Sequence, residues 1–207
     1  MIRLLSLLLL TLSAISSSWS ILSGIKQTFF FNNPFSVKKV VMSKLVYPSS
    51  FTEFGPLDDV VMGGSSSSSF VNGRWRGTIV TKSGGFCGIR SKAMELNASS
   101  YTGFELKLKG GGNNRYKFSV RDSTEWNGPA FTWSFDTKES GTTIKLPFNK
   151  AIPTKFAKTV SGNVSLDKAK ISSIQFTYSK FEFDGGLNPK FSGDGPFDLS
   201  VVSISLY

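Results

Sequence analysis

Apolar and polar residues alternate with a period of two through much of this chain, and this pattern restricts the fold more than any other feature. Clear examples lie at residues 104–109, 116–121, 131–135 and 144–148. The period is typical of a β-strand with one face against a hydrophobic core and the other face in water. No stretch of about a dozen residues carries a clear helical stripe. The sequence therefore predicts an all-β domain, in which the alternation points Trp133 inward.

Turn-forming residues separate the predicted strands. They cluster at residues 84–85, 110–114, 127–129 and 193–196. Many short antiparallel strands at close spacing are typical of a β-sandwich or jelly roll. The last strand, residues 197–207, changes parity between Val201 and Val202. This change predicts a bulge at that point or a strand that is buried on both faces.

The triplet Gly110–Gly112 invites comparison with a phosphate-binding loop. Such a loop needs a following helix whose N-terminus faces the anion, whereas the strand-like residues 116–118 follow here. We therefore predict that the three glycines form a hairpin connection between two strands.

The first 52 residues contain no Asp or Glu. They hold five of the 24 basic residues and all 14 acidic residues follow, so residues 53–207 carry a net charge of +5. The leucine-rich residues 4–12 resemble the apolar part of a signal peptide and fall short of the ~20 residues that span a bilayer. The Ser-, Phe- and Lys-rich segment that follows resembles a transit peptide. We interpret residues 1–45 as a presequence and residues 46–207 as the folded domain.

The two-part presequence favours import into a plastid. A mitochondrion is the second alternative, although one Arg beside an unbroken leucine run differs from the Arg-rich amphipathic helix of a mitochondrial presequence. Secretion is the third alternative, and the glycosylation sequons at Asn97 and Asn163 would be used only on that route.

Residues with catalytic chemistry are few. The sequence contains no His and a single cysteine, Cys87, so a catalytic Cys–His pair is impossible. A lone cysteine between Phe86 and Gly88 on a predicted strand is typical of a buried, inert thiol. The sequence also lacks a cofactor loop and a metal-ligand cluster. We therefore expect no cofactor and no enzymatic activity.

Residues 57–65 read Leu-Asp-Asp-Val-Val-Met-Gly-Gly-Ser. Side chains of neighbouring strand residues point to opposite faces, so Asp58 and Asp59 converge only if the local chain is a turn. We interpret one of them as a cap on backbone amides of the turn that Gly63 and Gly64 require. A structural calcium site is the alternative, although no nearby acidic run supplies further oxygen ligands.

Two kinds of large polar or aromatic residue are candidates for contact with a partner. Trp126 lies in the loop-like stretch 125–128, where an aromatic ring either meets a partner or folds over the end of the sandwich. Arginines are dispersed over the predicted strands, at positions 74, 76, 90, 115 and 121. Their dispersal argues against nucleic-acid binding and favours pairing with acids or contact with a protein.

Five blocks, spread over nearly all of residues 50–207, resemble, in the same order, the CIA30 family, the assembly factors associated with intermediates of respiratory complex I. The blocks are residues 58–65, 83–90, 106–118, 146–148 and 195–199. The chain departs from the family pattern at Ser83, Gly88 and Gly111, where the family has Asn, Ser and Asp. Because Gly111 stands where the family has Asp, any role of that carboxylate is absent from this chain.

The resemblance implies a galactose-binding-like jelly roll and a non-enzymatic, chaperone-like assembly factor for NADH:ubiquinone oxidoreductase or a related thylakoid complex. Its partners would be protein subunits of the assembling membrane complex, with no nucleic acid and with peripheral membrane contact at most. The candidate partner-binding or turn residues are Asp58, Asp59, Met62, Gly63, Gly64, Gly84, Gly85, Phe86, Arg90 and Trp126. The alternative function is that of a secreted or lumenal carbohydrate-binding module.

Overall fold

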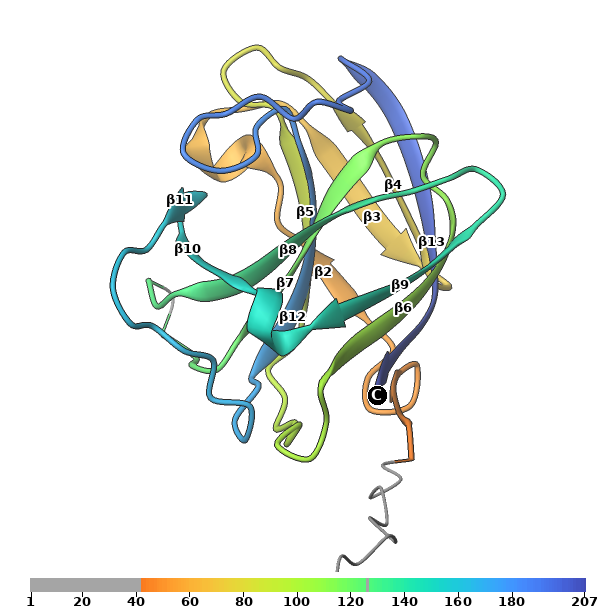
Figure 1. Cartoon of the computed structure of the whole chain (residues 1–207). Coiled ribbons are helices and arrows are strands. Elements are labelled where there is room, and N and C mark those ends of the chain that lie inside the picture. Colours follow the sequence, from red (N-terminus) through yellow and green to blue (C-terminus); the bar gives the residue numbers. More distant parts are fainter. Residues whose placement is uncertain (1–41, 126) are drawn as a thin grey trace, which may run out of the picture. The chain divides into compact units, whose positions relative to one another are not determined.

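The computed structural model describes residues 42–125 and 127–207, which lie in one compact unit from Val40 to Tyr207 (Figure 1). They form two antiparallel sheets and two short 3-10 helices, η1 (Asp59–Met62) and η2 (Phe148–Lys150). The strands of sheet A are, in spatial order, β3 (Ser67–Val71), β4 (Arg74–Ile79), β13 (Gly195–Leu206), β6 (Gly103–Gly110) and β9 (Thr142–Pro147), and β1 (Lys44–Tyr47) also pairs with β13. The strands of sheet B are β11 (Lys158–Thr159), β10 (Ile152–Lys155), β8 (Ala130–Asp136), β7 (Arg115–Arg121), β12 (Ser173–Ser179), β5 (Phe86–Ser91) and β2 (Phe54–Pro56).

Strand β1 includes the last two residues of the predicted presequence, and the rest of that presequence, apart from residues 42 and 43, lies outside the described residues. Neither helix in the described part of the chain is long and apolar enough to cross a membrane.

The core between the two sheets is rich in aromatic rings. Trp133 points inward, as predicted, and is 4 % exposed. Rings from the two sheets meet edge to face, with centroid distances of 6.0 Å between Trp75 and Tyr116 and 5.2 Å between Phe104 and Phe118. Such contacts add to the free energy gained by burying the rings. The predicted all-β sandwich is confirmed.

Strand β13 carries the predicted irregularity. Its register with β6 shifts between Val201 and Ser203, so one extra residue lies opposite a single partner. Val201 is 2 % exposed and Val202 is 47 % exposed, because the shift turns the next residue away from the core. The strand pairs with β6 on one side and with β4 and then β1 on the other.

The predicted hairpin at Gly110–Gly112 is wrong. The glycines connect β6 of sheet A to β7 of sheet B, and β6 pairs with β9 and β13 instead. All three have positive φ, from 63° to 86°. Residues that carry a Cβ atom favour negative φ, so glycine suits this connection between the two sheets. Alternation gives the period of each strand but not its partner.

Candidate functional site

The Asp59 carboxylate is fully buried (0 % exposed) and accepts four hydrogen bonds. Ser66 donates from its backbone N (2.9 Å) and its Oγ (2.7 Å). The backbone N–H groups of Gly85 (2.6 Å) and Phe86 (3.3 Å) donate from the other side. Burial alone raises the pKa of Asp59, but these hydrogen bonds outweigh it and hold the pKa below its usual value.

Asp58 makes a parallel set of contacts. Its Oδ2 and Oδ1 accept hydrogen bonds from the backbone N and the Oγ of Ser68, both at 2.7 Å, and Oδ1 also accepts from the backbone N of Gly88 at 3.1 Å. Through these hydrogen bonds the two carboxylates connect the start of η1 to residues 66–68, at and just before β3, and to residues 85–88, at and just before the start of β5. We call Asp58, Asp59 and these donor groups the aspartate latch.

The predicted cap on the Gly63–Gly64 turn is therefore wrong. That turn closes through backbone bonds alone, from Gly63 N to Val60 O (3.1 Å) and from Gly64 N to Asp59 O (3.0 Å). Both carboxylates do accept backbone amides, but these belong to segments 7 to 30 residues away in the sequence. The local chain is a 3-10 turn, which lets neighbouring side chains converge on the same pair of segments.

Glycines of two sequence blocks pack directly against the latch. A Cβ atom on Gly64 would lie 2.3 Å from Asp59 Cγ, and one on Gly84 would lie 2.2 Å from Asp59 Oδ2. Real Cβ atoms do not approach other atoms this closely, so both positions exclude any side chain unless the carboxylate moves. Gly63 takes a left-handed conformation, with φ of 84°, at the C-terminal cap of η1.

The latch holds two apolar side chains in water. Val60 is 57 % exposed and Met62 is 74 % exposed, although Asp59, one and three residues earlier in the chain, is buried. Single exposed apolar residues are common, but these two lie on one short turn whose ends are fixed by hydrogen bonds. The turn is therefore an apolar projection whose first residues are anchored by the latch.

A metal at the two aspartates finds little support in this geometry. Each of the four carboxylate oxygens already accepts a hydrogen bond from an N–H or O–H group. The part of the chain that the structure describes also contains no group of three or more His, Cys, Asp and Glu residues arranged to hold a metal ion.

The other predicted site residues do not all lie at the latch. Phe86 donates its backbone N–H to the latch, while Arg90 lies farther along β5, on the face of sheet B that points away from the core. Trp126 lies outside the described residues, so its role as a contact residue stays a prediction.

The face of sheet B that points away from the core, here called the outer face, is polar. Its residues on the three central strands are Arg115, Lys117, Ser119 and Arg121 of β7, Ala130, Thr132, Ser134 and Asp136 of β8, and Ser173, Gln175, Thr177 and Ser179 of β12. The hydroxyl groups of Ser119, Thr132 and Thr154 form a chain of hydrogen bonds of 2.8 and 3.0 Å. All three residues are buried, so this hydrogen-bonded chain satisfies groups that water does not reach.

The loop after β12 covers one end of the outer face. Lys117 is only 7 % exposed, because its Nζ donates to the carbonyl oxygens of Phe181 (2.6 Å) and Glu182 (2.9 Å) in that loop. Burial lowers the pKa of Lys117 to about 8, and the nearby charge of Glu182 opposes this shift. The alternating pattern does not predict this burial, because Lys117 has the parity of a solvent-facing residue.

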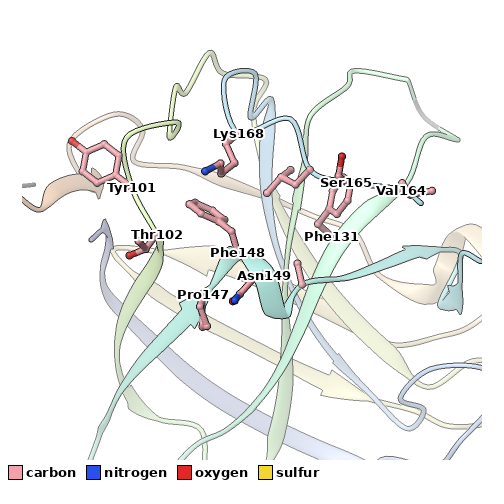
Figure 2. Close-up of a pocket in the computed structure, with 11 residues that line it drawn as sticks. Tyr101, Thr102, Phe131, Pro147, Phe148, Asn149, Val164, Ser165 and Lys168 are labelled. Atoms are coloured by element: carbon pink, nitrogen blue, oxygen red, sulfur yellow. The ribbon is translucent and has the colours of Figure 1, made fainter. Parts of the chain in front are cut away.

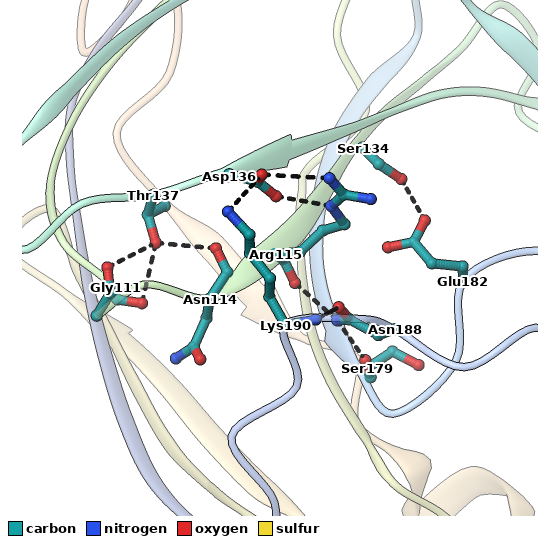
Figure 3. A network of polar contacts seen from close by, with 11 residues as sticks. Gly111, Asn114, Arg115, Ser134, Asp136, Thr137, Ser179, Glu182, Asn188 and Lys190 are labelled. Carbon is teal, nitrogen blue, oxygen red and sulfur yellow. Dashed lines mark hydrogen bonds and ion pairs between the residues drawn. The ribbon is translucent and has the colours of Figure 1, made fainter.

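The same end of the face holds an ion-pair network. Arg115 pairs with Asp136 at 2.6 Å, Lys190 pairs with Asp136 at 2.8 Å, and Ser134 Oγ donates to Glu182. Figure 3 shows how these side chains face one another. Arg74 and Arg76 pair with Asp198 at 2.6 and 3.0 Å on sheet A. Pairing of the dispersed arginines with acids is thus observed at three of the five positions.

An open pocket of about 630 Å³ lies at one end of the sandwich (Figure 2). Its lining includes the aromatic rings of Tyr101 and Phe148 and the polar side chains of Thr102 and Asn149. The Lys168 ammonium lies 5.7 Å from the centre of the Phe148 ring, within the range of a cation–π contact.

Cys87 offers no nucleophile. It is 0 % exposed, and burial together with the charge of Asp58 raises the pKa of its thiol far above the usual value. A thiol of this kind stays protonated and unreactive.

The sheets and their order define a β-sandwich of the galactose-binding-like class. The family 11 carbohydrate-binding module from Clostridium thermocellum in complex with a β-1,3-1,4-mixed-linked tetrasaccharide is similar, with a TM-score of 0.56, 18 % identity, and coverage of 81 % of this chain and 96 % of that chain. The family 11 module of the cellulosomal cellulase Lic26A-Cel5E of the same organism gives a TM-score of 0.55 and 18 % identity, with coverage of 81 % and 95 %. At these identities the likeness concerns the fold.

The family is shown by the sequence itself. The profile of the complex I intermediate-associated protein 30 (CIA30) family matches residues 43–201. The chain therefore belongs to the CIA30 family, and the resemblance seen in the five sequence blocks is confirmed. No protein of curated function matches the chain.

Proposed function

We propose that this protein assists the assembly of NADH:ubiquinone oxidoreductase, or of a related thylakoid complex, by binding incomplete subunits. The observation that carries the proposal is the match of the CIA30 family over residues 43–201. We further propose that it acts in a plastid or a mitochondrion, on the evidence of the two-part presequence, and that it has no enzymatic activity.

The geometry of η1 supports a binding role. Val60 and Met62 are exposed apolar side chains on a turn that the aspartate latch holds in place. A rigid contact loses less conformational entropy on binding than a flexible one, so a fixed apolar projection is suited to capture a partner. Exposed apolar anchors on a stable scaffold are typical of the centres of protein interfaces.

The chemistry of the described residues fits binding better than catalysis. The sequence has no His, and the only thiol is buried with a raised pKa. Both aspartates of the latch use their oxygens to accept structural hydrogen bonds, so neither is positioned as a general base.

The test is native fractionation of gently solubilised organelle membranes and matrix from cells that express the wild-type protein or a variant. We expect wild type to co-migrate with partial assemblies of complex I or of a thylakoid complex. Met62→Asp should reduce this co-migration several-fold while leaving the melting temperature unchanged, because Met62 is 74 % exposed.

Phe156→Asp is the matched control, since Phe156 is 68 % exposed and lies next to β11, at the opposite edge of sheet B from β2. We expect it to co-migrate like wild type. Migration of the wild-type protein as a free monomer in every fraction, under conditions of active assembly, would refute the assembly role. Wild-type behaviour of Met62→Asp would refute the part assigned to η1.

A carbohydrate-binding role is the second candidate, and the pocket in Figure 2 favours it. Tyr101 and Phe148 offer rings for stacking on a sugar, and Thr102 and Asn149 offer hydrogen-bonding groups. Binding of the wild type to a glycan array, abolished by Tyr101→Ala, would favour this role. Secretion and glycosylation at Asn97 or Asn163 would accompany it.

A further inference from the structure

Arg90 is held on the outer face of sheet B with most of its donors unused. Its Nε and Nη2 both donate to Gln175 Oε1, at 3.1 and 2.8 Å. A guanidinium has five N–H donors, so three of them have no acceptor among the described residues. Arg90 also makes no ion pair within residues 42–125 and 127–207, although its side chain is partly buried.

A second guanidinium acts on Arg90. Arg90 lies opposite Gln175 of β12, and Arg121 lies opposite Ser173, two residues along the same strand. Burial lowers the pKa of Arg90, and the positive charge of Arg121 lowers it further. Arg121 donates to the carbonyl oxygens of Glu125 and Gly128, both at 2.7 Å, and is thereby fixed on the loop after β7. Two partly buried like charges on one face favour the binding of an anion between them.

Within the described residues no acid forms an ion pair with Arg90, whereas the charge of Asp122 acts on Arg121. Gln175 lies opposite Ser119 in the sheet, and Ser119 continues into the neutral hydroxyl chain of the outer face. The carboxylates of that face are used at its other end, where Asp136 pairs with Arg115 and Lys190 and Glu182 accepts from Ser134. The two ends of the outer face therefore differ: Arg115 and Lys190 pair with an acid at one end, and Arg90 makes no ion pair with a described residue at the other.

We propose that Arg90, supported by Arg121, binds a carboxylate of an acidic segment of the partner protein on the outer face of sheet B. This inference rests on the proposed assembly function and adds a second contact to the η1 projection. The free edge of the Arg90 guanidinium is planar and presents parallel N–H groups, which match the two oxygens of a carboxylate. A neutral sugar fits this face less well, because the central strands β7, β8 and β12 present no aromatic ring on it for stacking.

The first experiment measures binding of a capped hexaglutamate peptide to the 207-residue protein at low ionic strength. A capped hexaglutamine peptide is the neutral control. We expect Arg90→Gln to weaken hexaglutamate binding about tenfold, the effect of one charge-assisted contact. Arg90→Lys should give an intermediate loss, because a lysine keeps the charge but not the planar fork.

Arg74→Gln is the matched control, since Arg74 lies on sheet A and is paired with Asp198. We expect it to bind hexaglutamate within about twofold of wild type, because exposed ion pairs contribute little. Equal losses in Arg90→Gln and Arg74→Gln would show a general charge effect and overturn the site. Tighter binding of oligogalacturonate than of hexaglutamate would overturn the protein partner and assign the site to acidic sugars.

The inference and the assembly function fail in different ways. Arg90→Gln that co-migrates with partial assemblies as wild type does would overturn the Arg90 contact and leave the assembly role intact. Wild type that migrates as a free monomer would overturn the assembly role itself. If Arg90→Gln melts at a much lower temperature than wild type, both the peptide-binding and the co-migration experiment are made with Arg90→Lys instead, since it retains a long basic side chain at the same position.

Discussion

Replacement of Asp59 by Asn tests the claim that the aspartate latch stabilises the fold. The Asn side chain has the same shape but offers one acceptor oxygen in place of two. With its oxygen in the place of Oδ2, it keeps the bonds from Ser66 Oγ, Gly85 and Phe86 in an uncharged form. Its NH₂ group then faces the backbone N–H of Ser66, which loses its acceptor.

The size of the effect follows from these contacts. Charge-assisted hydrogen bonds are about twice as strong as neutral ones, so each surviving bond weakens by roughly 1 kcal/mol. The stranded N–H of Ser66 costs about 1–3 kcal/mol. The lower cost of burying a neutral amide offsets part of this loss. We expect a net loss of ~3 kcal/mol in the free energy of unfolding, or a fall in melting temperature of roughly 6–12 °C.

The assay is urea unfolding of the 207-residue protein, followed by the fluorescence of the buried Trp75 and Trp133. Asp198→Asn is the matched control, because Asp198 is an exposed acid whose ion pairs with Arg74 and Arg76 contribute little. If the free energies of unfolding of the Asp59 and Asp198 variants differ by less than about 1 kcal/mol at pH 7, the stabilising role of the latch is refuted.

Acid provides an independent check on the same carboxylate. The folded-state pKa of Asp59 lies below its unfolded value, so its contribution to stability is complete above about pH 4 and is lost as the pH falls through the folded pKa. The difference in stability between wild type and Asp59→Asn should therefore shrink in that acidic range. A difference that stays constant there would show that the charge of Asp59 is not what stabilises the fold.

Two further substitutions test the packing of the latch and the burial of Lys117. Gly84→Ala should lower the free energy of unfolding by at least about 2 kcal/mol, because its Cβ would lie 2.2 Å from Asp59 Oδ2. The control is Gly55→Ala, whose Cβ would have its nearest neighbour at 4.0 Å, and it should stay within about 0.5 kcal/mol of wild type. Both are measured by urea unfolding. The pKa of Lys117 is lowered to about 8, so the unfolded chain binds more protons above that pH and stability rises with pH between about 8 and 10.5. Lys117→Met should remove roughly 3 kcal/mol of this rise, measured as the difference between the two stability–pH curves, and parallel curves would contradict the burial of a charged amine.

Much of the architecture could be predicted from the period of the sequence. The alternation gives the strands, and the parity change at Val201 and Val202 gives the bulge in β13. Strand pairing could not be predicted in the same way, because it depends on which edges meet in space. The crossing at Gly110–Gly112 has the local chemistry of a hairpin and connects two sheets instead.

The candidate site shows the same limit at the level of side chains. Adjacent Asp58 and Asp59 before a Gly–Gly pair predict a local cap, because short polar side chains often bond to their own turn. The actual donors are far away in the sequence, and only the folded arrangement brings β5 to the carboxylates. The exposure of Met62 could not be predicted either, since the residue type alone does not tell whether an apolar side chain in a turn is buried or exposed.

The structure separates the residues that hold the fold from those available to a partner, and this separation can be measured. Asp59 is fully buried, so it influences capture of a subunit only through the fraction of molecules that are folded and through the position of η1. Met62 is largely exposed and touches the partner in our proposal. Capture by Asp59→Asn should therefore recover toward wild type when the temperature is lowered from near the melting point or an osmolyte is added, because stability rises on cooling toward its maximum and osmolytes favour burial. Capture by Met62→Asp should stay low under the same conditions, since its fold is already intact. Recovery of both variants would place Met62 among the residues that stabilise η1, and recovery of neither would give Asp59 a direct role in the interface.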